Sequence, residues 1–129
     1  MNFLAHLYFS PNDSLVKTGN FMADWIKGKA YENYPVKVQQ GILLHRSIDD
    51  FTDKHPNVMQ SKSYFRDSYG KYAGVVTDIL YDHFLAKNWK EYENEDLQTY
   101  SNKTFRELIE MQELTERLSR IEKQLEARK

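Results

Sequence analysis

The sequence predicts a single all-α domain, and three observations support this fold class. The chain has 129 residues, which suits one domain with a modest core. Apolar residues recur three and four positions apart in several segments, which is the spacing of one helix face. Proline, glycine and capping residues stand between those segments, where helices begin and end. We predict a helical core over residues 1–95 and a charged, long amphipathic helix over residues 96–129.

The N-terminal part of the chain predicts one short element and one longer helix. Residues 2–9 are apolar and fit either a helix or a strand. The turn after them offers Asp13 or Ser14 as a helix N-cap. The helix that follows should run over residues 15–27 and stop at Gly28, since glycine commonly ends helices.

The next predicted helix opens after Pro35 and continues through Phe51. On one of its faces lie Val38, Ile42, His45 and Asp49. This stripe begins apolar and ends as an imidazole and a carboxylate one turn apart. Burying such groups is costly unless they are paired, hydrogen-bonded or bound to a metal. For this pair alone, a half-exposed ion pair on the helix face is the simpler interpretation.

Two further helices are predicted over residues 57–69 and 72–89. The second is the most apolar segment of the chain, yet it carries Asp78 and Asp82 on one stripe, with His83 next to the second carboxylate. Apolar residues surround these carboxylates on every side of the helix. We therefore expect them not to be simply exposed to solvent.

The C-terminal segment is rich in Glu, Lys and Arg and contains neither proline nor glycine from residue 97 onward. Its apolar residues follow a spacing of three and four: Met111, Leu114, Leu118, Ile121 and Leu125. This pattern is a short heptad seam of about two heptads. It predicts either a helix that packs on its own domain or a seam that pairs with a second copy of the chain.

Composition narrows the classes of partner. A formal net charge of −1 gives no reason to expect a nucleic-acid partner. The chain contains no cysteine, which rules out disulfides and Cys-based zinc sites. Its first residues lack the pattern of a signal peptide, and no stretch approaches the roughly 20 apolar residues of a membrane helix. We expect a cytoplasmic protein without membrane association.

Several ionisable residues stand in apolar surroundings on different predicted segments: His6, Asp24, His45, Asp49, Asp78, Asp82 and His83. Helices packed around one core can point such groups into one cavity, where they would repel one another unless a cation joined them. Oxygen and nitrogen ligands without thiolates suit Mn²⁺, Mg²⁺ or Fe²⁺. Such a site suits hydrolysis, and Arg46 is placed to hold a phosphate oxygen. The residues alone indicate a helical metal-dependent hydrolase.

Four motifs carry a resemblance to a known family. They are MNFLAH at residues 1–6, GNFMAD at 19–24, GILLHR at 41–46 (followed by Ile48-Asp49 and Thr52-Asp53) and YDHFL at 81–85. Together, and in register as far as about residue 100, they resemble the acyl carrier protein phosphodiesterase family. The resemblance implies an all-helical fold similar to HD-type metallophosphohydrolases. It also implies hydrolysis of 4′-phosphopantetheine from holo-acyl carrier protein to give apo-acyl carrier protein, with a divalent metal, Mn²⁺ first and Mg²⁺ or Fe²⁺ as alternatives.

The resemblance also assigns residues to roles. The metal ligands it implies are Asp24, His45, Asp49 and Asp82. The groups it implies for catalysis are His6 and His83 as acid–base or supporting groups and Arg46 on the phosphate. Because acyl carrier proteins are acidic, docking should need cations near the site, and the candidates are Lys27, Lys29 and Lys87.

Members of the family usually continue with further helices, whereas this chain ends in the charged seam helix. We expect that helix to compensate, either by packing on its own domain or by forming a homo-oligomer. Two other functions stay open: an HD-like phosphohydrolase that acts on a small phosphoester, and a shortened helical module that binds or self-associates without catalysis.

Overall fold

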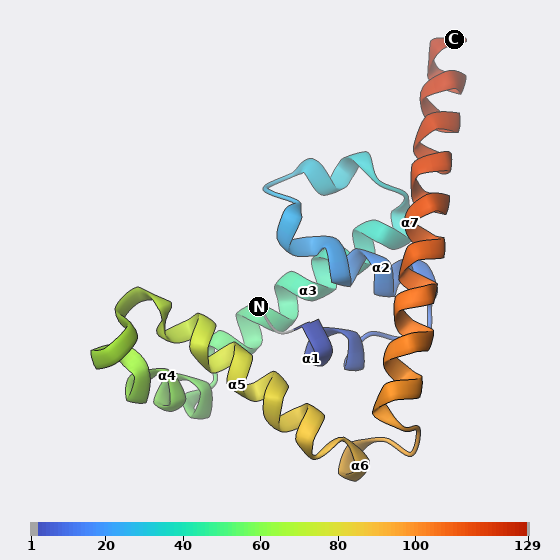
Figure 1. Ribbon diagram of the computed structural model, residues 1–129. Helices are drawn as coiled ribbons and strands as arrows, with labels where there is room; N and C mark the ends of the chain where they lie inside the picture. The colour runs from blue at the N-terminus through green and yellow to red at the C-terminus, as the bar shows by residue number, and fades with distance from the viewer. Residues whose placement is uncertain (1–2, 129) are drawn as a thin grey trace.

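The computed structural model describes residues 3–128, and this part of the chain consists of helices and connecting loops without any strand (Figure 1). The all-α prediction is confirmed. Met1 and Asn2 of the first motif, and Lys129, lie outside the described residues. The elements are, in chain order, α1 (Phe3–Tyr8), α2 (Ser14–Met22), the 3₁₀ helices η1 (Ala23–Trp25) and η2 (Ala30–Asn33), α3 (Val36–Lys54), α4 (Pro56–Tyr69), the 3₁₀ helix η3 (Gly70–Tyr72), α5 (Ala73–Lys87), α6 (Trp89–Tyr92) and α7 (Leu97–Ala127).

The centre of the fold is the crossing of α2 and α3, where two glycines let the backbones touch. A Cβ atom added at Gly19 would lie 2.1 Å from the carbonyl oxygen of Val38, and one added at Gly41 would lie 2.0 Å from that of Val16. Neither distance is possible for a real side chain, so this crossing requires glycine in both helices. Next to it, Val38 and Ile42 are fully buried and form the core with Ala23.

The start of α2 follows the prediction, but its end does not. Asp13 is the N-cap, since its Oδ1 accepts hydrogen bonds from the amides of Leu15 and Val16, each at 3.1 Å. The α-helix stops at Met22 instead of continuing to residue 27. The chain tightens into η1, a 3₁₀ turn of the kind that often ends an α-helix, and Gly28 follows with a φ of +54°.

The stripe predicted on α3 is present. Val38, Ile42 and His45 are buried, and Asp49 is half-buried at the rim of the same face. Helix α3 begins after Pro35 and extends three residues beyond the predicted end, to Lys54. The two helices predicted after it are confirmed as α4 and α5.

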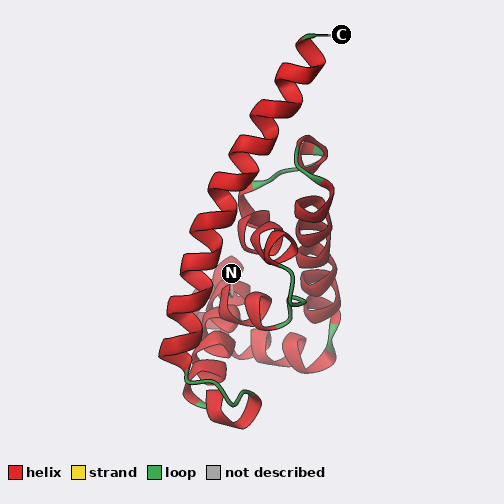
Figure 2. Ribbon diagram, turned by 90° about the vertical axis from the view of Figure 1, so that its right-hand side faces the viewer, coloured by secondary structure: helices red, strands yellow, loops and turns green. Residues whose placement is uncertain are grey.

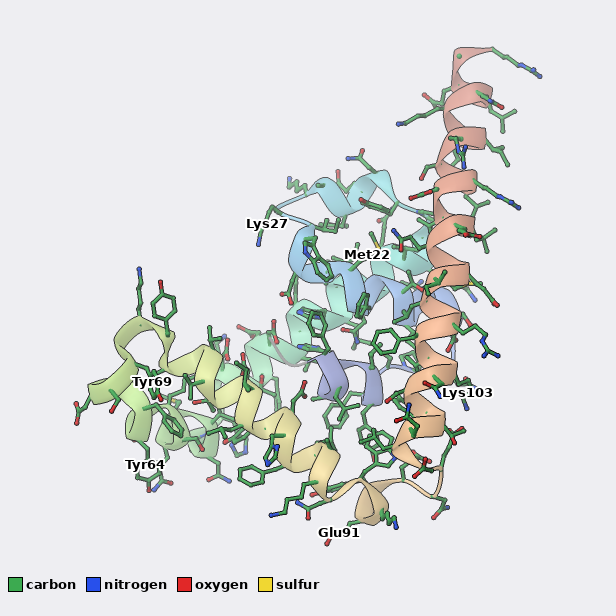
Figure 3. The ribbon with its side chains drawn as sticks, in the orientation of Figure 1. Met22, Lys27, Tyr64, Tyr69, Glu91 and Lys103 are labelled. Atoms are coloured by element: carbon green, nitrogen blue, oxygen red, sulfur yellow. The ribbon has the colours of Figure 1, made fainter. Side chains whose placement is uncertain are left out.

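Helices α4 and α5 form an outlying pair with little core. Helix α4 buries none of its residues, and α5 buries Ala73 and Thr77. Figure 3 labels Tyr64 and Tyr69 on the outer side of α4, where they are 70% and 52% exposed. Figure 1 shows α4 at the edge of the molecule and α5 running from there to α6.

Helix α7 packs on the domain with its N-terminal half. An ion pair between Lys17 and Glu107, with 3.0 Å between Nζ and Oε2, joins it to α2. Its buried residues are Thr104, Leu108 and Thr115. The C-terminal half extends beyond the other helices (Figure 2), and along the predicted seam Leu114, Ile121 and Leu125 are exposed. Packing on its own domain therefore does not cover the whole seam.

None of the helices within residues 3–128 is long and apolar enough to cross a membrane.

Candidate metal centre

Two buried histidines from different helices stack face to face at the middle of the fold. His6 of α1 and His45 of α3 are 2% and 4% exposed. Their ring centroids lie 3.7 Å apart and the rings are inclined by 11°. Two imidazoles held this close inside a protein disfavour a second positive charge unless anions lie beside them.

Two carboxylates supply that negative charge. Asp49, one turn after His45, places Oδ1 2.8 Å from Nε2 of His6 and Oδ2 3.2 Å from Nε2 of His45. Asp24 of η1 places Oδ1 3.2 Å from the same Nε2 of His45. The side chains of Asp24 and Asp49 are 31% and 46% exposed, so the carboxylates form the open side of a site whose imidazoles are buried.

The geometry shifts the pKa values of one acid and one base in opposite directions. Burial alone would raise the pKa of Asp49, but hydrogen bonds with His45 and His6 outweigh it and hold this pKa well below its usual range. Burial alone would lower the pKa of His45, but the hydrogen bond with Asp49 and the charges of Asp49 and Asp24 raise it. The carboxylate of Asp49 therefore stays ionised throughout the neutral pH range.

One buried amide side chain, that of Asn20, hydrogen-bonds to both histidines. Asn20 of α2 is fully buried, and its backbone oxygen and Oδ1 lie 2.9 Å and 3.0 Å from Nδ1 of His45. Its Nδ2 donates to the carbonyl oxygen of His6 at 3.0 Å and to Oγ of Ser10 at 2.7 Å. Asn20 was not among the predicted site residues, although it stands in the GNFMAD motif one turn before Asp24.

This donor set fits a divalent cation. One ligand atom each from His6, His45 and Asp49 lie within 4.8 Å of one another. Within residues 3–128, Nδ1 of His6 and Oδ2 of Asp24 are buried and lack a hydrogen-bond partner. Buried polar atoms without partners are rare, and a missing ion is one of their recognised causes. Imidazole nitrogens with carboxylate oxygens suit Mn²⁺ and Fe²⁺.

Comparison with known proteins identifies the family. A family model described as acyl carrier protein phosphodiesterase matches residues 1–129. The chain belongs to this family. Among curated proteins named acyl carrier protein phosphodiesterase, it is 43% identical to the one from Photorhabdus laumondii over 89 residues, which are 69% of this chain and 45% of the relative.

Other relatives of that name show the same partial coverage. The protein from Pectobacterium atrosepticum is 39% identical over 89 residues, 69% of this chain and 46% of the relative. The one from Yersinia pestis is 37% identical over 91 residues, 70% of this chain and 47% of the relative. The chain thus spans about half the length of the curated relatives it matches. No solved structure matches it.

Of the ligands that the family resemblance implied, the structure brings Asp24, His45 and Asp49 together, and it adds His6 as a direct neighbour. Asp82 has a different set of contacts. Its two carboxylate oxygens accept hydrogen bonds from the amides of Leu4 and Ala5, at 3.0 Å and 2.9 Å. These amides open α1, so Asp82 caps and orients the helix that carries His6.

The other ionisable residues of α5 also lie outside the group of His6, His45 and Asp49. His83 is exposed, and its ring contacts the edge of Phe84 at a centroid distance of 5.4 Å. Asp78 and Asp82 are half-buried, as the apolar surroundings predicted. The pKa of Asp78 is raised, first by burial and also by the charges of Asp53 and Asp49.

Arg46, the residue predicted to bind phosphate, contacts Ile26, which follows η1, and Tyr31 of η2. Nη2 of Arg46 donates to the carbonyl oxygen of Ile26 at 3.1 Å, and its guanidinium carbon lies 5.3 Å from the ring centroid of Tyr31. Through these contacts, Arg46 joins α3 to η2 and to the residue that follows η1, beside Asp24.

The three predicted docking lysines are exposed but do not form one patch. Lys27 and Lys29 stand between η1 and η2, whereas Lys87 closes α5, next to α6. Figure 3 labels Lys27 on the segment that follows η1 and Glu91, on α6, at the bottom of the view. The three lysines therefore belong to two separate parts of the fold, the segment after η1 and the end of α5.

Proposed function

We propose that this chain carries the metal centre of a phosphodiesterase that hydrolyses 4′-phosphopantetheine from holo-acyl carrier protein. The observation that supports the proposal is the pair of stacked, buried histidines next to two carboxylates. One carboxylate oxygen and one imidazole nitrogen of this group have no hydrogen-bond partner among residues 3–128. This arrangement occurs in a member of the acyl carrier protein phosphodiesterase family, and it uses the residues of three of the four motifs.

In this proposal His6, His45, Asp49 and Asp24 hold one divalent ion, with Mn²⁺ as the first candidate and Mg²⁺ or Fe²⁺ as alternatives. When bound there, the ion would supply Lewis-acid polarisation of the phosphoryl group and activation of a water molecule. The chain itself provides an Asp49 that is ionised at neutral pH, two buried imidazoles, and a partly exposed carboxylate side toward which a substrate phosphate can approach.

Lys27 and Lys29 are our candidates for contact with the acidic carrier protein, since they follow η1, the 3₁₀ helix that carries Asp24. Because docking occurs away from the bond that breaks, Lys27→Glu should raise KM more than it lowers kcat. Lys87→Glu, at the far end of α5, is the matched charge reversal, and its KM should change less.

The experiment that tests the function is incubation of the purified chain with holo-acyl carrier protein and Mn²⁺, followed by intact-protein mass spectrometry. Loss of the phosphopantetheine mass from the carrier protein, abolished by Asp24→Ala, is the expected result. Asp50→Ala is the matched control, since Asp50 is an exposed aspartate that pairs with Lys54 outside the site.

Two other results would redirect the proposal. A chain that is folded and binds Mn²⁺ but leaves the carrier protein intact would favour a small phosphoester as substrate. A chain that binds neither Mn²⁺ nor other divalent ions would favour a binding module without catalysis.

We also propose self-association through the seam of Met111, Leu114, Leu118, Ile121 and Leu125, because its C-terminal part is exposed beyond the domain. Leu118→Glu should then shift the molecular mass measured by light scattering to that of a monomer. Gln112→Glu adds the same charge on the same helix at a position outside the seam and its flanking positions, and it should leave the mass unchanged. A monomeric unmodified chain would exclude the seam as an interface.

A further inference from the structure

Asn20 is the most completely buried polar side chain next to the metal centre, and both polar atoms of its side chain hydrogen-bond to a histidine of that centre. Its exposed fraction is 0%. On one side, its backbone oxygen and Oδ1 face Nδ1 of His45. On the other side, its Nδ2 donates to the backbone oxygen of His6 and to Oγ of Ser10.

These contacts fix which nitrogen of His45 carries a proton. Two oxygen atoms that can only accept lie within 3.0 Å of Nδ1, so Nδ1 must donate to them. In the neutral ring the lone pair is then on Nε2, which lies 3.2 Å from an oxygen of Asp24 and 3.2 Å from an oxygen of Asp49. A lone pair that faces two carboxylates is repelled unless a proton or a cation lies between them.

We propose that Asn20 is a positioning residue, whose side chain keeps His45 in the Nδ1–H form with Nε2 available to a metal ion and ties this ring to the backbone of His6. The metal part of this inference rests on the proposed function. The orientation of a ligating imidazole by a partner on its other nitrogen is the usual role of such a group, and its loss lowers metal affinity by roughly 10- to 100-fold.

The hydrogen bond from Asn20 to Ser10 connects Asn20 to His6 a second time. Oγ of Ser10 accepts from Asn20 and donates to the carbonyl oxygen of His6 at 2.9 Å. The carbonyl oxygen of His6 therefore receives two hydrogen bonds, one from each of these side chains. The glycine crossing of α2 and α3 is what brings Asn20 against His45, because Asn20 directly follows Gly19.

The test compares three variants of the full chain. Asn20→Ala removes both branches of the network and leaves the backbone oxygen as the remaining acceptor for His45. Asn20→Asp keeps an acceptor toward Nδ1 but removes the donor toward His6. Thr18→Ala is the control for loss of a buried polar side chain on the same helix, since Thr18 is 4% exposed and its hydroxyl donates within α2, to the carbonyl oxygen of Ser14.

Two measurements are made on each variant: Mn²⁺ affinity by titration calorimetry, and the tautomer of His45 by ¹⁵N NMR of the metal-free chain at a pH where the ring is neutral. We expect Asn20→Ala to weaken Mn²⁺ binding by about 10- to 100-fold and to raise the fraction of the Nε2–H form. Asn20→Asp should restore the Nδ1–H form without restoring full affinity. Thr18→Ala should change neither quantity, even if it unfolds at a lower temperature.

Three results would overturn the inference: an unchanged Mn²⁺ affinity and tautomer in a folded Asn20→Ala, equal losses in Asn20→Ala and Thr18→Ala, or an Nε2–H form in the unmodified chain. The last measurement needs no variant, so it decides the matter even if Asn20→Ala does not fold. These outcomes are separate from failure of the proposed function, in which Mn²⁺ binds and the carrier protein is not cleaved.

Discussion

The crossing of α2 and α3 and the pair of α4 and α5 are built in opposite ways. At the crossing, two glycines bring backbones into contact, and Val38 and Ile42 are completely buried. In the outer pair, α4 buries nothing, and large apolar residues of both helices are exposed, among them Met59, Tyr64, Tyr69, Val75, Ile79 and Phe84.

The difference shows where this sequence demands a unique geometry. The crossing carries Asn20, His45 and Asp49, whose hydrogen bonds of about 3 Å tolerate little displacement, and its backbone contact leaves no alternative spacing of the two helices. The outer pair contributes Asp82 to the cap of α1 but few buried contacts. Stability and metal binding should therefore respond strongly to changes at the crossing and weakly to matched changes in the outer pair.

The same substitution at two glycines should give effects of opposite sign. In Gly41→Ala the new methyl would lie 2.0 Å from the backbone oxygen of Val16 and 2.7 Å from the amide nitrogen of Asn20, so the helices must separate. We expect a loss of about 3 kcal/mol in the free energy of unfolding. The measurement is urea unfolding followed by circular dichroism.

Gly74→Ala is the matched change in the outer pair. Its methyl would lie 3.6 Å from Cε of Lys62, an ordinary contact with a flexible side chain. Alanine favours the helix over glycine, so we expect a gain of about 0.5 to 1 kcal/mol. A loss of stability at Gly74, or none at Gly41, would contradict the contrast between the two regions.

Two neighbouring aspartates on α3 should differ sharply in metal binding. Asp49 contacts both buried imidazoles, whereas Asp50 makes an exposed ion pair with Lys54. We expect Asp49→Ala to weaken Mn²⁺ binding by at least about 100-fold, since a ligand and the charge that balances His6 and His45 are lost together.

Asp50→Ala should change Mn²⁺ affinity by less than about twofold, because exposed ion pairs contribute little. Titration calorimetry on both variants gives the comparison. Equal losses would mean that the ion is held by the general acidity of α3 rather than by the histidine pair.

Much of this contrast could be predicted from the sequence, because it depends on local patterns. Helix periodicity predicted α3 with Val38, Ile42, His45 and Asp49 on one face, and the capping residues predicted where α2 begins. The convergence of His6, Asp24 and Asp49 was a sound hypothesis because each polar group stood among apolar neighbours.

The parts that could not be predicted depend on contacts between distant segments. The role of Asn20 requires knowing that α1 and α3 both reach its side chain, and no local pattern separates it from an ordinary helix residue. The 3₁₀ turn of η1 shortened α2 and set the position of Asp24. Asp82 is 78 and 77 positions away from the amides of Leu4 and Ala5, from which it accepts hydrogen bonds. His83 is exposed although the apolar residues Phe84 and Leu85 follow it.

The metal-free chain should lose stability as the pH rises through neutrality. The folded pKa of His45 is raised, so its contribution is fully present below its unfolded pKa of about 6.5 and is lost as the pH rises through the folded value. The slope for one group cannot exceed about 1.4 kcal/mol per pH unit. Urea unfolding between pH 6 and pH 8.5 measures it.

Mn²⁺ should reverse this trend, because the ion competes with the proton of His45 and binds better as the pH rises. Stabilisation by a fixed Mn²⁺ concentration should thus increase over the same range. In His45→Gln both trends should be reduced. A pH slope that persists unchanged in His45→Gln would assign the effect to another group.

The smallest expected difference concerns two isoleucines that lose one methyl group each. Ile42 is fully buried in the core beside the crossing, whereas Ile79 on α5 is 57% exposed. Ile42→Val should cost about 1 kcal/mol in the free energy of unfolding, since it removes a packed methyl and leaves a small cavity. Ile79→Val should stay within about 0.5 kcal/mol. Both positions are inside helices, so the change in helix propensity is the same and cancels in the comparison. If Ile79→Val proved as costly as Ile42→Val, the exposed face of α5 would be covered in solution, and the outer pair would have a packing partner that the described residues do not provide.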